Sequence, residues 1–323
     1  MTESPLAEFS NLAIIAAIVV FMMAFIGYAI DLAKSASVRS DERLEKRRGT
    51  VVTGVTTDET ADDSDGLTVL GFASGLAAVA TVLQFIGVVL RGLATQRVPW
   101  GNMYEFTMTG SAVIMLLFLV LALRLKDLRH LGIFILGPML ILMLVAQTMW
   151  FLPAAELTPS LQNSHWLVIH VIVAIISISL FSIGAVTSVL QLLQAKREQR
   201  EKAGEPITLP GFNAVLSRVP GAKRLEALSF QINAVGFVLW TFTLISGSIW
   251  ANYAWGRYWG WDPKEVWTFV IWIVYAAYLH ARATQGFRGN RAAYFALAGF
   301  ASVVFNYTVV NTVINGLHSY SGL

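Results

Sequence analysis

Long runs of apolar residues, separated by shorter polar stretches, dominate the chain. Eight runs approach or exceed the roughly 20 residues that a helix needs to cross a bilayer core. They cover residues 11–33, 68–90, 105–123, 131–149, 166–194, 230–249, 265–281 and 293–314. The fifth run continues into a charged extension, AKREQREK, so its helix should project beyond the membrane. The pattern predicts an all-α fold, a polytopic membrane helix bundle of about eight spans.

Composition supports this class of protein. Of the 323 residues, 56% are aliphatic or aromatic and only 13% are charged, whereas soluble domains carry about 25% charged residues. The first run starts close to Met1, behind Glu3 and Glu8 and without a preceding Lys or Arg. A cleavable signal peptide begins with a basic region, so we interpret this run as a membrane span.

The distribution of basic residues predicts the orientation in the membrane. If the N-terminus lies outside, the inner loops hold 19 of the 23 Lys and Arg residues. Only Arg91, Arg97, Arg257 and Lys264 then lie outside. The positive-inside rule therefore places both termini on the outer face. The pI of about 9.2 reflects this topology and requires no nucleic-acid partner.

The absence of cysteine and the two long inner loops limit the chemistry and the domain organisation of the chain. Without cysteine, the chain has no disulfides, no thiolate metal ligands and no C-x-x-C-H site of its own for haem. Residues 34–67 have few large apolar residues and are predicted to be disordered. Residues 211–230 are expected to include a short helix on the inner surface. We divide the chain into residues 1–67, the first span and a disordered cytoplasmic loop, and residues 68–323, one transmembrane domain.

One outer loop is unusually rich in tryptophan. The stretch WGRYWGWDPKEVW, residues 255–267, is called the Trp-rich loop below and holds four of the ten tryptophans. An aromatic belt at the membrane interface explains most outer tryptophans, but a belt requires no interleaved glycines. Because glycine allows unusual backbone angles and close approach to a ligand, we expect Trp255, Trp259 and Trp261 to form a flat platform.

Charged residues of the same loop suggest both a ligand and a helix start. Arg257 and Lys264 suit a planar apolar ligand with carboxylates on its edge, and haem has this form. Asp262, Pro263 and Glu265 also occupy the N-cap, first and third positions of a predicted helix. Residues 102–105 repeat this pattern. A capping role and a direct role in ligand binding are both open for Asp262.

Five histidines are available as ligands for haem iron. His170 lies about one turn below the outer surface and His318 ends the last span, so both should reach a ligand on the Trp-rich loop. A single interfacial histidine is more often an ordinary polar group, but two converging on one loop favour a site. His280 lies about 22 Å below the outer surface, where an ionisable group is a functional candidate. His130 is expected to be structural and His165 an accessory residue.

These motifs together resemble those of a known family. The stretch WANYAWGRYWGWDPKEVWTFVIWIVYAAYLHAR is similar to the WWD signature of haem-handling proteins, in the form found in the cytochrome c biogenesis protein CcsA/ResC family of system II. VPWGNMYEF, SHWLVIHV and INGLHSYSG extend the resemblance to roughly residues 85–323. Gly260 departs from the pattern, since many members carry a larger polar residue there.

The resemblance implies a function and a set of partners. Haem b is carried across a bacterial plasma membrane, held reduced on the outer face and joined to the two thiols of an apocytochrome c C-x-x-C-H site. A ResB-type subunit is the implied partner in a haem lyase complex, and thiol–disulfide reductant proteins act indirectly. A haem exporter or chaperone without ligation activity is the alternative. A cytochrome b that transfers electrons would need paired histidines within the bundle, and a structural subunit would tolerate loss of the outer histidines.

The resemblance also assigns roles to individual residues. His170 and His318 correspond to the outer axial ligands of the iron. Trp255, Trp259, Trp261 and Asp262 belong to the haem-binding motif between them. His280 corresponds to the membrane-embedded histidine that receives incoming haem together with a histidine of the partner subunit. No residue is implied as a nucleophile.

Overall fold

The computed structural model describes residues 4–47, 60–154, 164–204, 213, 215–284 and 286–318. All regular structure within these residues is helical. The long helices are α1 (Pro5–Arg47), α2 (Thr60–Thr95), α3 (Met103–Arg124), α4 (Gly132–Met149), α5 (His165–Lys202), α7 (Ala222–Trp255), α8 (Pro263–Thr284) and α9 (Asn290–Tyr307). A 3-10 helix, η1 (Lys126–Leu131), precedes α4, and the short α10 (Val309–Thr312) follows α9.

The helices confirm the predicted membrane bundle. Eight helical segments in the described part of the chain are long and apolar enough to cross a membrane, and α9 and α10 together form the last of them. Large apolar side chains such as Phe72, Ile141 and Val238 lie exposed on the outside of the bundle, as expected for a surface in contact with lipid.

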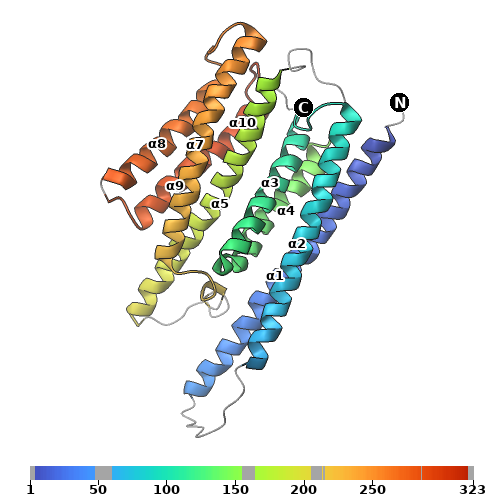
Figure 1. Ribbon diagram of the computed structural model, residues 1–323. Coiled ribbons are helices and arrows are strands. Elements are labelled where there is room, and N and C mark those ends of the chain that lie inside the picture. Colours follow the sequence, from blue (N-terminus) through green and yellow to red (C-terminus); the bar gives the residue numbers. More distant parts are fainter. Residues whose placement is uncertain are drawn as a thin grey trace.

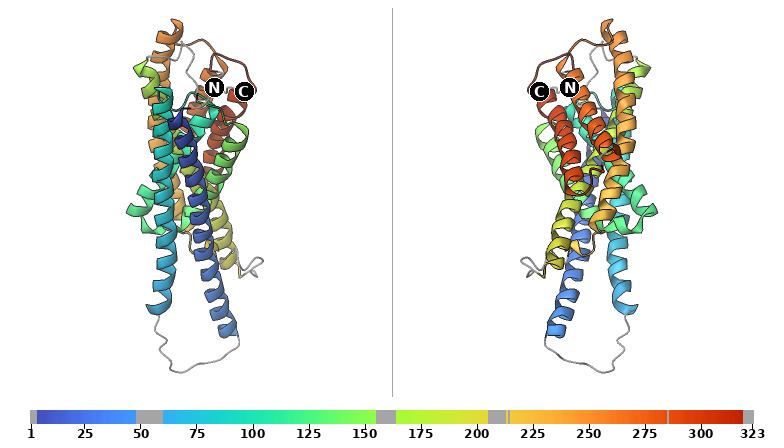
Figure 2. Two further views of the ribbon diagram at one scale, coloured as in Figure 1. Left: turned by 90° about the vertical axis from the view of Figure 1, so that its right-hand side faces the viewer. Right: turned by 90° about the vertical axis from the view of Figure 1, so that its left-hand side faces the viewer.

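The bundle consists of two groups of helices that meet along α3 and α5. Figure 1 shows α1 to α4 on one side and α5, α7, α8 and α9 on the other. Phe21, Met115 and Leu136 lie in the core of the first group, and Trp240 and Tyr275 in that of the second. The described chain begins and ends at the same end of the bundle (Figures 1 and 2), which we call the terminal end.

Two helices begin at the terminal end with the predicted caps. The Asn102 side chain accepts a hydrogen bond from the Glu105 N–H (2.9 Å) at the start of α3. At the start of α8, Asp262 accepts from the Lys264 N–H (3.2 Å), and Glu265 accepts from the Asp262 N–H (3.0 Å). Each cap satisfies backbone groups that a helix end leaves without partners, and so fixes where the preceding loop meets its helix.

The structure corrects the prediction for the loop after the first span. Helix α1 continues to Arg47 and α2 starts at Thr60, so the disorder predicted for residues 34–67 is wrong over these parts; residues 48–59 lie outside the described residues. The polar stretch after the first span contains Glu, Lys, Arg and Leu, which are good helix formers. A helix already nucleated in the membrane extends through such residues at little cost.

The segment before the sixth span also differs from the expectation. Helix α7 starts at Ala222 and occupies the second half of the region expected to hold a separate surface helix. Before it, a single turn links the Ser217 N–H to the Asn213 carbonyl (3.0 Å), and Leu216 and Val219 are buried. The apolar side chains near Pro220 therefore pack into the bundle instead of covering the membrane surface.

Candidate functional site

A cavity opens at the terminal end, between α3, α5, α7, α8 and α9. Its walls include His170, Trp250, Trp259, Lys264 and His318. The structure thus brings together the two histidines predicted to share a ligand, although they are far apart in the sequence. The cavity has a volume of about 180 Å³, below the roughly 300–1,000 Å³ of pockets that bury most of a drug-sized ligand. A large planar ligand would therefore keep one edge outside.

The surroundings of His170 fix the protonation of its ring. On α5, the His170 Nδ1 atom lies 2.9 Å from the Thr243 carbonyl oxygen of α7. A carbonyl only accepts hydrogen bonds, so Nδ1 carries a proton, and in the neutral ring Nε2 then carries the lone pair. The ring lies parallel to the Trp250 indole, with centroids 6.1 Å apart. Histidines that bind metals use this arrangement, in which the second nitrogen donates to an acceptor that orients the ring.

Helix α7 makes room for this imidazole at Gly247. A Cβ atom at this position would lie 2.7 Å from Cε1 and 2.8 Å from Nδ1 of His170, closer than real Cβ contacts allow. The missing side chain thus determines where the ring can lie.

We expect Gly247→Ala to displace the His170 ring and to weaken haem retention about as much as His170→Ala does. Haem content of the purified protein, measured by absorption, checks this. Gly110→Ala is the matched control, because a Cβ there meets no atom within 4 Å. Normal haem content in Gly247→Ala, or equal loss in both variants, would contradict the assignment.

His318 is held by a carboxylate. Its Nδ1 atom lies 2.8 Å from the Asp262 Oδ2 atom, and the other carboxylate oxygen accepts a hydrogen bond from the Leu317 N–H (2.6 Å). The rings of Trp250 and Trp255 contact the His318 imidazole edge-on, at centroid distances of 5.6 and 5.0 Å. Asp262 therefore both caps α8 and anchors the segment that carries His318. A direct role of Asp262 in ligand binding stays a prediction.

The charge of Asp262 follows from these contacts. Burial alone would raise its pKa, but hydrogen bonds from His318 and from the Leu317 and Lys264 N–H groups outweigh burial and lower the pKa below its ordinary value. The carboxylate thus contributes stability above the ordinary pKa of about 3.9, and this contribution is lost as the pH falls through the lower folded-state pKa. At neutral pH Asp262 is ionised, and His318 Nδ1 must donate to it.

We expect Asp262→Asn to weaken haem retention by roughly 10- to 100-fold, the usual effect of removing a partner of a metal ligand. If the amide oxygen keeps the Leu317 N–H, the amide NH₂ faces His318 and favours a proton on Nε2, which removes the lone pair. Haem content is the measurement, with helicity by circular dichroism as the control for folding. Wild-type retention, or a further large loss when His318→Ala is added, would contradict this role.

The Trp-rich loop does not form the flat platform predicted for it. The rings of Trp259 and Trp261 are 86° apart, with centroids separated by 5.9 Å. Trp259 lines the cavity, Trp255 packs on His318, and Trp261 is 77% exposed with a left-handed backbone (φ 60°). The three indoles therefore have three different positions, and Trp250 of α7 is the tryptophan that contacts both histidines.

The two loop glycines also differ from each other. Gly256 ends α7 with a left-handed backbone (φ 70°), as expected for a helix C-terminus. At Gly260 a Cβ atom would lie 1.0 Å from a terminal nitrogen of Arg257. The absence of a side chain at Gly260 thus gives the Arg257 guanidinium its space beside Glu265, 3.5 Å away, and the Trp255 ring.

Buried polar groups at the cavity suit a ligand that carries carboxylates. The Lys264 ammonium donates to the Asn311 side chain (2.7 Å) and the Asn306 carbonyl (3.1 Å), which leaves one N–H of the three. The indole N–H groups of Trp100 and Trp250 are buried and have no acceptor within the described residues. Both tryptophans line the cavity. These residues fit haem, whose carboxylates only accept hydrogen bonds at neutral pH.

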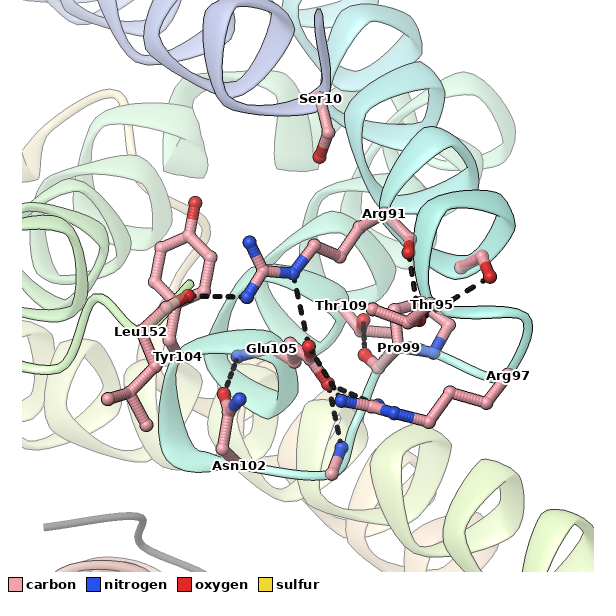
Figure 3. A network of polar contacts seen from close by, with 12 residues as sticks. Ser10, Arg91, Thr95, Arg97, Pro99, Asn102, Tyr104, Glu105, Thr109 and Leu152 are labelled. Carbon is pink, nitrogen blue, oxygen red and sulfur yellow. Dashed lines mark hydrogen bonds and ion pairs between the residues drawn. The ribbon is translucent and has the colours of Figure 1, made fainter. Parts of the chain in front are cut away.

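A buried ion network holds the loop on the opposite wall. In Figure 3 the Glu105 carboxylate lies between the guanidinium groups of Arg91 and Arg97, at 3.1 and 2.6 Å, and accepts the Gly101 N–H (2.9 Å). Arg91 also donates to the Leu152 carbonyl, so it joins two loops of the terminal end. The same loop and the start of α3 contribute residues to the cavity wall, namely Trp100, Gly101 and Met103. Arg91 and Arg97, two of the four basic residues predicted on the outer face, therefore have a structural role.

The other histidines lie away from the cavity. His280 is exposed on α8, near the end opposite the termini, and His165 is exposed at the start of α5. His130 lies 3.3 Å from the buried Asp31 carboxylate, a contact that agrees with a structural role. The sequence did not indicate Thr243, Gly247 or Trp250, because they resemble ordinary residues of an apolar span. The only signal in the sequence was Gly247, a small residue about one helical turn before Trp250.

Comparisons with known proteins cover the whole site. A family model described as cytochrome C assembly protein matches residues 76–318. A cytochrome c biogenesis protein CcsA from Guillardia theta is 34% identical over 265 residues, which are 79% of this chain and 86% of the relative. CcsA proteins from Chlamydomonas reinhardtii and Gloeobacter violaceus are 38% and 50% identical, over 52% and 32% of this chain. These two matches span 43% and 30% of the relatives, less than half their length.

Proposed function

Because the chain belongs to the family of cytochrome c assembly proteins, we propose that it holds haem between His170 and His318 on the outer face of the membrane. With a ResB-type partner, it promotes attachment of this haem to the C-x-x-C-H site of an apocytochrome c. The family shows a role in cytochrome c biogenesis, and the eight membrane-spanning helices show a multi-pass membrane protein. The ligands, the partner and the ligation step are our proposal.

The observation that carries the proposal is the matched state of the two histidines. Each has its Nδ1 proton directed at an acceptor, the Thr243 carbonyl or the Asp262 carboxylate, and each lines the same cavity. In its neutral form, each imidazole therefore presents the lone pair of Nε2 to the cavity, and this lone pair can bind iron. A pair of neutral imidazoles is a common axial set for haem.

The remaining residues of the site orient the ligand. Lys264 and the indole N–H groups of Trp100 and Trp250 are placed to receive the carboxylates. Trp259 supplies an apolar wall, and the small cavity leaves the opposite edge of the macrocycle outside. Each thioether forms when a thiol S–H adds across a vinyl C=C bond, so the chain need only position the two reactants. The histidine of the apocytochrome then replaces one of the two axial ligands at release.

His280 supports a route from the inner side. Its exposure on α8, at the level of the membrane, leaves its ring accessible to a second subunit. An ionisable side chain in this position is otherwise costly in lipid. We propose that His280 and a histidine of the ResB-type partner bind haem entering from the cytoplasm, and that haem then moves to the cavity at the terminal end. The expected location is a bacterial plasma membrane.

A ligation assay separates this function from haem export without ligation. Haem-loaded protein, purified with its partner, is incubated under reducing conditions with a peptide that contains C-x-x-C-H. We expect a covalent haem–peptide adduct by mass spectrometry, and none with a peptide in which serine replaces both cysteines. Haem that leaves for an acceptor protein while the cysteine peptide stays unmodified would contradict ligation and favour an exporter.

A further inference from the structure

A second cavity lies at the end of the bundle opposite the termini. Residues of α5, α7, α8 and α9 line it, and its volume of about 870 Å³ is ample for a small-molecule ligand. Figure 1 shows α5 continuing past the end of α8 and the start of α9, and these two segments supply part of the lining. None of the residues assigned to the haem site lines it.

The charges around this cavity favour an anion. Three basic residues, Lys223, Arg282 and Arg288, and one acidic residue, Glu226, belong to its lining. Arg282 forms an ion pair with Glu226, which also accepts the Gly289 N–H (3.0 Å). Lys223 and Arg288 are exposed and have no ion-pair partner within the part of the chain that the structure describes. The lining therefore carries a surplus of two positive charges.

Two helix N-termini add to this positive potential. Helix α7 starts at Ala222 and α9 at Asn290, and both residues line the cavity. The first N–H groups of a helix carry partial positive charge and readily bind phosphate. One of them, on Ala222, already donates to Glu198 (2.9 Å), a residue outside the lining. The remaining N–H groups reinforce the cations.

The rest of the wall is apolar and suits an amphiphile. Phe230, Ala195 and Ala283 line the cavity, and the Arg282 guanidinium lies over the Phe230 ring, 4.8 Å from its centroid. A free inorganic anion would gain nothing from this surface, whereas the glycerol and first acyl carbons of a phospholipid would cover it. In the orientation given by the basic loops, the cavity lies at the headgroup level of the inner leaflet, where anionic lipids gather.

We propose that this second cavity binds the phosphate group of an anionic phospholipid of the inner leaflet. The phosphate lies between Lys223, Arg288 and the two helix N-termini, and its apolar portion lies along Phe230. The bound lipid joins the inner ends of α7, α8 and α9. This inference is independent of the proposed haem chemistry and rests on the positive-inside orientation.

Lipid binding to the complete purified protein tests the proposal. After exchange into detergent, dissociation constants for phosphatidylglycerol and phosphatidylcholine are measured by native mass spectrometry. We expect a preference for phosphatidylglycerol that falls about 10- to 30-fold in Lys223→Gln/Arg288→Gln, at about 1 kcal/mol for each basic residue. Lys196→Gln/Arg291→Gln is the matched control, because it removes two inner-side charges that do not line the cavity.

Each alternative outcome overturns the proposal in a distinct way. Equal binding of the two lipids, or an equal loss in the control variant, would show that the cavity selects no headgroup. Displacement of the lipid by millimolar inorganic phosphate would identify a free-anion site, and displacement by micromolar haem would identify a haem entry site. Arg282 stays unchanged in every variant so that its ion pair with Glu226 preserves the fold.

Discussion

Cells in which alanine replaces both His170 and His318 are expected to lose mature c-type cytochromes by more than about 100-fold. Loss of a residue that only hydrogen-bonds to a metal ligand already lowers metal affinity or activity by roughly 10- to 100-fold. The double variant removes both ligands themselves. Each single variant retains one imidazole and should lose at least about tenfold. Covalent haem on the cytochromes, detected by peroxidase staining of denaturing gels, measures the effect.

The chain provides a matched control for this experiment. His165 lies on the same helix as His170, five residues earlier, but is exposed and does not line the cavity. His165→Ala should therefore keep cytochrome maturation near the wild-type level. Added imidazole should partly restore the single variants, since it can occupy the vacated ligand position. Loss of maturation in His165→Ala equal to that in His170→Ala, or normal maturation in the double variant, would be incompatible with paired axial ligation.

Glu105→Ala is expected to destabilise the protein by about 3–5 kcal/mol, because removing one partner of a buried ion pair leaves an uncompensated charge. The Glu105 side chain is fully buried, and Arg91 is only 3% exposed. In the variant, Arg91 and Arg97 would lie side by side without a carboxylate between them, and the Gly101 N–H would lose its acceptor. The loop that brings Trp100 to the cavity should loosen as well.

Thermal unfolding in detergent, monitored by near-ultraviolet circular dichroism, measures this loss. Glu201→Ala is the control, since Glu201 is 66% exposed and pairs with Arg197 at 3.7 Å. Such an exposed pair contributes about 0.3–0.5 kcal/mol. Similar unfolding temperatures for the two variants would mean that water reaches the Glu105 site and that the network is not the anchor of this loop.

The fold was predictable because membrane spans have a strong signature, but their ends were not. An apolar run marks the part of a helix that lies in lipid. The helix itself ends at a capping residue or where residues of low helix propensity begin. The sequence predicted helix caps at Asp262 and Asn102, and α8 and α3 start directly after these residues. At Arg47 and Ala222 no such signal marks the end or start, so α1 and α7 are longer than the apolar runs predicted.

The candidate site was predictable as a set of ligands and less so as a geometry. Two histidines at one side of a membrane, near a Trp-rich loop, were enough to place His170 and His318 together. The directions of the indole rings depend on backbone angles, which the sequence pattern does not reveal. Trp261 has a left-handed backbone, and the three indoles do not form the expected flat platform. Thr243 and Gly247 were missed because they act through a carbonyl and through an absent side chain.

The most direct test of the central claim is the absorption spectrum of purified protein carrying His280→Ala, titrated with haem and then reduced. In this background the proposed entry ligand His280 is absent, and His170 and His318 of the cavity at the terminal end remain. We predict the spectrum of low-spin haem with two imidazole ligands, weakened when His170 or His318 is also replaced and absent when both are. An unchanged spectrum after both replacements, or no bound haem with both histidines present, would contradict the account.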